Sequence, residues 1–214
     1  MKSKKIRTSP TPRQEILQTA AECFMERGFH ATSIDDVARR MNATKGRIYH
    51  YYASKTDLFF DIHREGMERL FAAVLPAQQS PGNGLAVLAA MLRAHALALF
   101  EHHAFESVVV QGVQLHRYGA LTPSQRQTLD ELIASRDHFE QLFKTQTDAA
   151  KADGSLGELH TSIAVKTILG GLQWSLIWYR PEVNNSIENQ HLLAEQMVRT
   201  LIQGLKSRDI GSAE

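Results

Sequence analysis

The chain has 214 residues, of which 43% are hydrophobic and 22% charged. This composition excludes a disordered or fibrous protein, and a chain of this length buries enough surface to fold without a disulfide or metal. The single cysteine, Cys23, cannot form an internal disulfide. The basic N-terminus is not followed by a signal-like apolar segment, and no apolar run reaches the roughly 20 residues that span a bilayer. We therefore expect a cytoplasmic protein with no membrane partner.

The charges are unevenly distributed, although the formal net charge is only +1. Residues 1–60 hold 11 Lys and Arg against 6 Asp and Glu, whereas residues 61–214 hold 13 against 17. A basic N-terminal region that binds a polyanion would produce this asymmetry. A chance excess of lysines near the N-terminus would produce it equally well, so charge alone leaves both explanations open.

The first predicted helix begins at Pro12. Thr11 and Gln14 form a capping-box pattern around this proline, which suits the first helical position. Apolar residues then recur at helical spacing over 16–24 and form one stripe. Gly28 is the expected end of the helix, because glycine commonly follows the last helical turn.

Two short helices and one long helix follow. The spacing predicts short helices over 34–41 and from Thr44 to about residue 52, with Asn42 in the turn because asparagine tolerates a left-handed backbone. A capping-box pattern then opens a long helix over 54–75, which Pro76 is expected to stop.

The rest of the chain also has helical periodicity. Its one β-branched run, 108–110, lies inside a helical pattern, so no strand is expected. The pattern predicts an all-α fold with further helices at about 85–101, 104–119, 123–152, 161–179 and 187–207.

The two short helices, together with the helix before them, form a helix-turn-helix pattern. This arrangement places a recognition helix in the major groove of double-stranded DNA. Ile48 and Tyr52 can pack inward, while Gly46 and His50 lie on the opposite side. The alternative is an ordinary helical hairpin with a solvated charged face.

The exposed side of the second short helix suggests individual DNA contacts. Arg47 can donate two hydrogen bonds to guanine, Lys45 offers a mobile charge, and Gly46 allows close approach to the duplex. Hydroxyls at helix N-termini and nearby tyrosines and lysines suit phosphates. The predicted DNA-binding residues are Ser33, Thr44, Lys45, Gly46, Arg47, Tyr49, His50, Tyr51 and Lys55.

The segment from Gly28 to Leu58, GFHATSIDDVARRMNATKGRIYHYYASKTDL, closely resembles the signature of the tetracycline-repressor (TetR) family of bacterial regulators. Two departures are mild: Met-Asn-Ala at 41–43 replaces the usual Ala-Gly-Val, and Tyr52 replaces the usual Phe. The resemblance implies a homodimer that binds a DNA operator. It also implies a three-helix DNA-binding head at 10–58 and a larger helical ligand-binding and dimerisation body at 59–210.

The last predicted helix carries an apolar stripe of Leu193, Met197, Leu201 and Leu205. Such a stripe can pack within its own bundle or against a partner chain. The resemblance implies the second arrangement, in which the last two helices of each subunit form a four-helix bundle across the dimer axis.

The segment 170–181 is the most unusual part of the predicted body. Gly170, Trp174 and Trp178 share one helix face, where aromatic residues can belong to the core, to a dimer interface or to a ligand pocket. The Trp-Tyr-Arg-Pro ending resembles TetR regulators of lipid, steroid or aromatic-acid breakdown, several of which respond to acyl-coenzyme A thioesters. The candidate effector pocket therefore comprises Phe105, Tyr118, Trp174 and Trp178.

The leading hypothesis is a repressor that a small-molecule effector, an acyl-coenzyme A or another hydrophobic metabolite, releases from a palindromic operator. The alternative is a ligand-binding helical protein or an enzyme whose head is only scaffold. The sequence has no phosphate loop, nucleophile elbow or zinc-protease motif, so we expect no enzyme and no cofactor. We also expect no metal site, but solvated or partly buried helix histidines, at His95, His102, His103 and His116.

Overall fold

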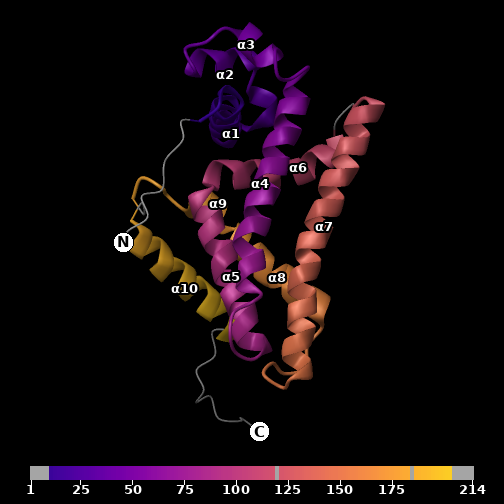
Figure 1. Cartoon of the computed structure of the whole chain (residues 1–214), viewed down its shortest axis with the longest axis vertical. Helices are drawn as coiled ribbons and strands as arrows, with labels where there is room; N and C mark the ends of the chain where they lie inside the picture. Colours follow the sequence, from indigo (N-terminus) through magenta and orange to yellow (C-terminus); the bar gives the residue numbers. More distant parts are fainter. Residues whose placement is uncertain (1–9, 119–120, 184–185, 204–214) are drawn as a thin grey trace. The chain divides into compact units, whose positions relative to one another are not determined.

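The computed structural model describes residues 10–118, 121–183 and 186–203, without the side chains of 113–118. Its regular structure within these ranges is entirely helical, which confirms the predicted all-α fold (Figure 1). The helices are α1 (Pro12–Ala31), α2 (Ile34–Arg40), α3 (Lys45–Tyr49), α4 (Lys55–Ala77), α5 (Gly84–Glu101), α6 (His103–Tyr118), α7 (Pro123–Ala152), α8 (Thr161–Gln173), α9 (Ser175–Trp178) and α10 (Ile187–Gln203).

The chain forms two compact units. Unit 1 combines the residues up to Gly66 with Ala104–Leu132, and unit 2 combines Met67–His103 with the residues from Ile133 onward. Helices α4 and α7 each contribute residues to both units. The predicted domains, 10–58 and 59–210, are continuous in sequence, and their limits stay a prediction.

Unit 1 has a core built around the apolar stripe of α1. Phe24 lies edge-on to Phe59 of α4, with ring centroids 5.5 Å apart. Helices α2 and α3 are too short to be stable alone and are held by burial of their apolar residues in this core. The buried residues are Ile16, Leu17, Ala20 and Phe24 of α1, Val37 and Ala38 of α2, Ile48 of α3, and Leu58, Phe59 and Ile62 of α4.

Gly28 interrupts α1 where the sequence predicts the end of the first helix, but a short helical segment follows the kink. Gly28 adopts a left-handed backbone with φ of +78°, and helical structure resumes as far as Ala31. The hydroxyl of Thr32 donates to the carbonyl oxygens of Cys23 and Gly28, at 3.1 and 2.8 Å. These bonds satisfy carbonyl groups that the kink removes from the helical pattern.

The boundaries of α3 and α4 also differ from the prediction. Helix α3 ends at Tyr49, and the side chain of Thr44 forms no capping hydrogen bond with it. Pro76 lies inside the last turn of α4, which ends at Ala77. A proline so close to the end removes only one helical N–H donor, so the helix continues past it.

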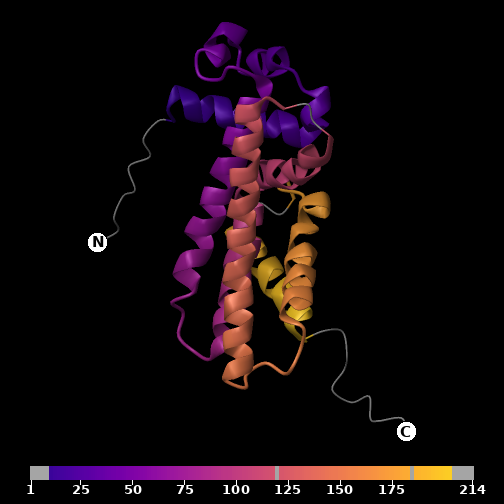
Figure 2. The ribbon, with the colours of Figure 1, turned by 90° about the vertical axis from the view of Figure 1, so that its right-hand side faces the viewer.

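Helix α5 is the central helix of unit 2. It contacts α8 and α10, and α8 also contacts α10 (Figure 2). Within the described residues, α5 alone is long and apolar enough to cross a membrane, with a mean hydropathy of 1.5 over 18 residues. This run still falls short of the roughly 20 residues expected of a membrane span. Its composition fits a core helix, because ten of its residues are buried.

The C-terminal helices differ from the prediction at two points. The predicted helix 161–179 is divided into α8 and α9 at Trp174. The last helix is described as far as Gln203, so Leu205 lies outside the described residues. Leu201 of α10 faces Gly171 of α8, where a Cβ atom on the glycine would lie 2.8 Å from Cδ2 of the leucine. Part of the α10 stripe therefore packs within its own chain.

His95 is fully buried in unit 2, which corrects the expectation of a solvated or partly buried histidine. The imidazole lies between Phe139 and Phe143 of α7, with ring centroids 5.3 and 5.8 Å away. It faces inward because α5 is apolar on nearly every side. His102 and His103 are partly buried, and the side chain of His116 is outside the described residues.

Burial of His95 predicts a loss of stability in acid. Desolvation lowers its pKa from 6.5 to about 4. The unfolded chain therefore takes up a proton at this residue below pH 6.5, whereas the folded chain resists protonation until about pH 4. Full stability is present above pH 6.5 and falls toward pH 4, by about 3 kcal/mol for a shift of this size.

Urea unfolding of His95→Leu across this pH range measures the effect. The variant should lose about 3 kcal/mol less stability than the wild type between neutral pH and pH 4. His191→Leu, which changes an exposed histidine, is the control and should follow the wild-type curve. Parallel wild-type and His95→Leu curves would show that His95 does not cause the acid sensitivity.

Candidate nucleic-acid interface

Helix α3 has one buried side and one exposed side. Ile48 is completely buried, whereas half of the surface of Tyr49 is exposed. Of the nine residues predicted to bind DNA, all lie in unit 1, seven are exposed, and Arg47 and Lys55 are partly buried. The structure thus presents the predicted residues at a surface around α3.

A groove of about 360 Å³ brings four of the predicted residues together. Ser33, Lys45, Tyr49 and Lys55 line it, along with the turn between α1 and α2. His30 lies in the same groove but was missed by the sequence analysis, because it is far from α3 in the chain. The groove brings a phenol and two ammonium groups together beside the Asp35 carboxylate, and the phenol and ammonium groups suit a phosphate backbone.

The two cations of α3 are paired with carboxylates of neighbouring helices. Arg47 Nη2 donates to Glu15 Oε2 of α1 at 2.6 Å, and Lys45 Nζ lies 3.6 Å from Asp35 Oδ1 of α2. All four side chains are substantially exposed, and such pairs contribute only about 0–1 kcal/mol. Both cations can therefore exchange their carboxylates for groups on DNA at little cost.

Lys55 is engaged within the protein. Its ammonium donates to the carbonyl oxygens of Phe29 and Thr32, at 2.7 and 2.8 Å, and lies 4.3 Å from the centre of the Phe29 ring. Desolvation lowers the pKa of Lys55. An ammonium group has three hydrogens, so one is left for a phosphate. The lysine fixes the α1–α2 turn, and its contact with DNA stays a prediction.

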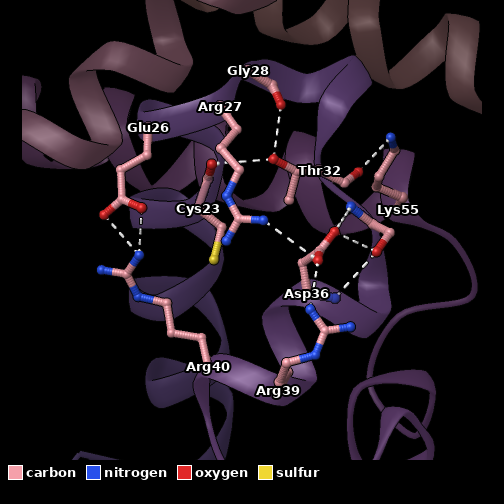
Figure 3. A network of polar contacts seen from close by, with 10 residues as sticks. Cys23, Glu26, Arg27, Gly28, Thr32, Asp36, Arg39, Arg40 and Lys55 are labelled. Carbon is pink, nitrogen blue, oxygen red and sulfur yellow. Dashed lines mark hydrogen bonds and ion pairs between the residues drawn. The ribbon is translucent and has the colours of Figure 1, made fainter.

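Ser33 serves as the cap of α2. Its backbone N–H and its hydroxyl both donate to Asp36 Oδ2, at 2.9 and 2.6 Å. These bonds lower the pKa of Asp36 to about 2, so the carboxylate is ionised at neutral pH. Arg27 and Arg39 lie on either side of this carboxylate (Figure 3). The donors of Ser33 are thus committed to α2, and its phosphate contact stays a prediction.

A second group of ion pairs joins α2 to α1. Arg40 of α2 lies 2.6 Å from Glu26 Oε2 of α1 (Figure 3). It also lies 3.1 Å from Glu22 Oε2 of the same helix. Cys23 is buried beside them, and burial raises the pKa of its thiol. These contacts fix α2 on α1 and therefore fix the base on which α3 rests.

The structure does not assemble the four predicted effector-pocket residues in one unit. Phe105 is buried in unit 1, whereas Trp174 and Trp178 belong to unit 2 and are 64% and 41% exposed. The side chain of Tyr118 lies outside the described residues. A pocket made of these residues stays a prediction.

Unit 2 contains an apolar cavity of about 240 Å³ that the sequence analysis missed. No short motif could have revealed it, because its walls come from distant parts of the chain. They are Leu85, Leu88, Thr147, Leu156, Leu159, Ala164, Thr167, Ile168, Leu201 and Ile202. Across the described part of the chain, no group of three or more His, Cys, Asp or Glu side chains is placed to hold a metal ion.

The packed three-helix head and the exposed, partly basic surface of α3 define a helix-turn-helix DNA-binding protein. Residues 16–62 match the model of the bacterial regulatory proteins of the tetR family, and residues 81–205 match a tetracyclin repressor-like C-terminal domain. The chain belongs to the TetR family and is a DNA-binding transcriptional repressor. Regulators of this family are in general not enzymes.

Individual relatives span nearly the whole chain. The HTH-type transcriptional repressor KstR2 of Rhodococcus jostii is 26% identical over 197 residues, which cover 91% of each chain. The structure of the ketosteroid transcriptional regulator KstR2 of Mycobacterium tuberculosis is similar in fold, with a TM-score of 0.78 and 23% identity over 94% of this chain and 97% of the other. AibR in complex with isovaleryl coenzyme A and operator DNA has a TM-score of 0.70 and 25% identity, covering 90% and 98%.

Proposed function

We propose that this repressor acts in the cytoplasm as a homodimer and binds a palindromic operator through the surface around α3. The exposed, partly basic surface around α3 carries this proposal, because it combines the arginine, the lysine and the tyrosine of α3 with Tyr51 just after the helix, over a buried anchor at Ile48. The nine predicted residues are the proposed contacts. Arg47 would bind a base edge, while Lys45 and the tyrosines would bind phosphates.

The dimer is supported by an apolar surface on unit 2. Of the ten large hydrophobic residues that are exposed in the described chain, seven lie between 163 and 192. One side of α8 and α9 carries three of these exposed residues, Ile163, Trp174 and Ile177. Gly170 lies between them, and no atom lies within 4 Å of the position that a Cβ atom on this glycine would take. An apolar surface of this kind is characteristic of a protein interface. Two linked copies would present two α3 helices to successive major-groove faces.

The proposed effector is a hydrophobic small molecule that binds the body and weakens operator binding. An acyl-coenzyme A is the class that we propose first, supported by the similarity to AibR, whose structure contains isovaleryl coenzyme A and operator DNA. Helix α4 contributes to both units, so a small change in its tilt could alter the spacing of the heads. A coupling free energy of about 1–3 kcal/mol would suffice for useful release.

A gel-shift assay with the wild-type protein tests DNA binding. The probe is a duplex that the protein itself selects from a random-sequence pool, and an inverted repeat is the expected product. Affinity should fall steeply with salt, with a slope of log K against log salt of about −0.9 for each phosphate contacted. Failure to enrich any sequence, or binding insensitive to salt, would contradict the proposal.

The same duplex tests effector release. Isovaleryl coenzyme A is the first probe, and free coenzyme A is the control for the nucleotide portion. With a coupling of about 1–3 kcal/mol, the thioester should weaken operator binding by about 5- to 150-fold. Equal effects of the two compounds would exclude recognition of the acyl group, and unchanged operator binding would exclude this effector.

A further inference from the structure

A buried carboxylate connects three elements of unit 1. Asp61 of α4 is only 9% exposed and accepts hydrogen bonds from three side chains. Tyr52 donates to Oδ2 at 2.6 Å, Arg13 donates to the same oxygen at 2.5 Å, and Arg64 donates to Oδ1 at 3.1 Å. These donors come from the segment after α3, from the first turn of α1 and from α4 itself.

Tyr52 ties this carboxylate to the recognition helix. Its backbone N–H donates to the carbonyl oxygen of Ile48 at 3.0 Å, so the residue continues the last turn of α3. Its ring is 7% exposed, and its hydroxyl points back to α4 through the bond to Asp61. Burial and this hydrogen bond raise the pKa of the Tyr52 phenol, so the group remains a donor at neutral pH.

The first turn of α1, which binds α4 through Arg13, also contacts α3. Glu15 accepts the hydrogen bond from Arg47 at 2.6 Å, two residues after Arg13 binds Asp61. Helix α3 has only five residues and cannot hold its own orientation. Arg47 gives up this pair when it binds DNA, so the rotation of α3 about its axis is then set by Ile48 in the core and by the buried Tyr52–Asp61 hydrogen bond.

We propose that Asp61 is a positioning residue for DNA binding: through the hydroxyl of Tyr52 it fixes the orientation of α3 relative to α4. This inference rests on the DNA interface proposed above. A phenol bonded to a carboxylate is a strong, directional contact. The chain thus has a link between α3 and the helix that contributes to both units.

The decisive variant is Tyr52→Phe, which keeps the ring in the core and removes one hydroxyl. We expect its affinity for the selected duplex to be about 5- to 10-fold weaker, which corresponds to about 1–1.4 kcal/mol of binding free energy. Affinity is measured at a temperature at which circular dichroism shows every variant to be folded. Tyr179→Phe removes a phenol hydroxyl of similar burial from unit 2, where it accepts from Gln190, and should bind the duplex as the wild type does.

Asp61→Asn and the double variant complete a mutant cycle. If the two residues act as one contact, the double variant should bind no more weakly than Asp61→Asn alone. If Tyr52→Phe binds the duplex within twofold of the wild type and only its melting temperature is lower, the contact stabilises the fold without positioning α3. That result would overturn the proposal. The interface itself is tested by substitutions of Lys45 and Arg47, so its failure is distinguishable from failure of the Tyr52–Asp61 link.

Discussion

Replacement of both Lys45 and Arg47 by alanine should abolish most of the operator affinity. A bidentate contact of arginine with guanine is worth about 1–3 kcal/mol, and a dimer contains it twice, so Arg47 alone accounts for a weakening of about 30-fold or more. Removal of Lys45 should also make the salt slope less steep by about 1 for each subunit. Fluorescence anisotropy with a labelled duplex, repeated at several salt concentrations, measures both effects.

The matched control removes two cations of the same kind from unit 2. Arg93 lies 3.4 Å from Glu195 and Lys151 lies 3.5 Å from Glu158, so alanine at both positions breaks surface pairs comparable to those of Arg47 and Lys45. This variant should retain the affinity and salt slope of the wild type. If both double variants lose operator affinity equally, binding depends on the overall charge of the protein. If neither variant loses affinity, α3 is not the helix that contacts DNA.

The sequence was sufficient where structure depends on neighbouring residues. The capping box of Thr11 with Gln14, the hydrogen bond from the Asp57 N–H to the Ser54 hydroxyl at the start of α4, and the left-handed Asn42 need only a few adjacent residues and are all present. The inward orientation of Ile48 followed from helical spacing for the same reason. The head was predictable because most of its elements are marked by local caps and turns, although α3 has no side-chain cap.

The electrostatic partners of the recognition surface were not predictable. Glu15 and Arg47 are 32 residues apart, and Arg13 and Tyr52 meet at Asp61 only because α1 and the segment after α3 pack against α4. No local pattern distinguishes Glu15 from any other acid in a first helical turn. A close pair in space that is distant in sequence becomes visible only when the packing of the helices is known.

The body was less predictable than the head for a related reason. Helical periodicity placed Trp174 and Trp178 on one face but could not say whether that face is inside or outside the fold. Their exposure now favours the outer surface of unit 2, beside Ile177. The residues that line the apolar cavity of unit 2 come from many segments of the chain. Helical periodicity indicates that such residues are buried, but it does not show that they line a common ligand site.

Aspartate at both Trp174 and Ile177 should convert the dimer into monomers. The two side chains are 64% and 66% exposed on one face of the C-terminal helices, so their replacement should leave the fold of unit 2 intact. In a dimer they would be buried, and an unpaired buried charge costs several kcal/mol. Because a monomer contacts one half-site, operator affinity should fall by a factor of 100 or more, on the order of 3 kcal/mol.

Leu75→Asp is the control, because Leu75 is a similarly exposed apolar residue, at 44%, on α4. Analytical ultracentrifugation should find this variant dimeric and the double variant monomeric, with the same helical content by circular dichroism. Shortening the duplex to one half-site should then weaken wild-type binding but leave the monomeric variant almost unaffected, since only the dimer uses both halves. A double variant that stays dimeric would place the subunit interface elsewhere, and the exposed tryptophans would then be free to serve the effector instead.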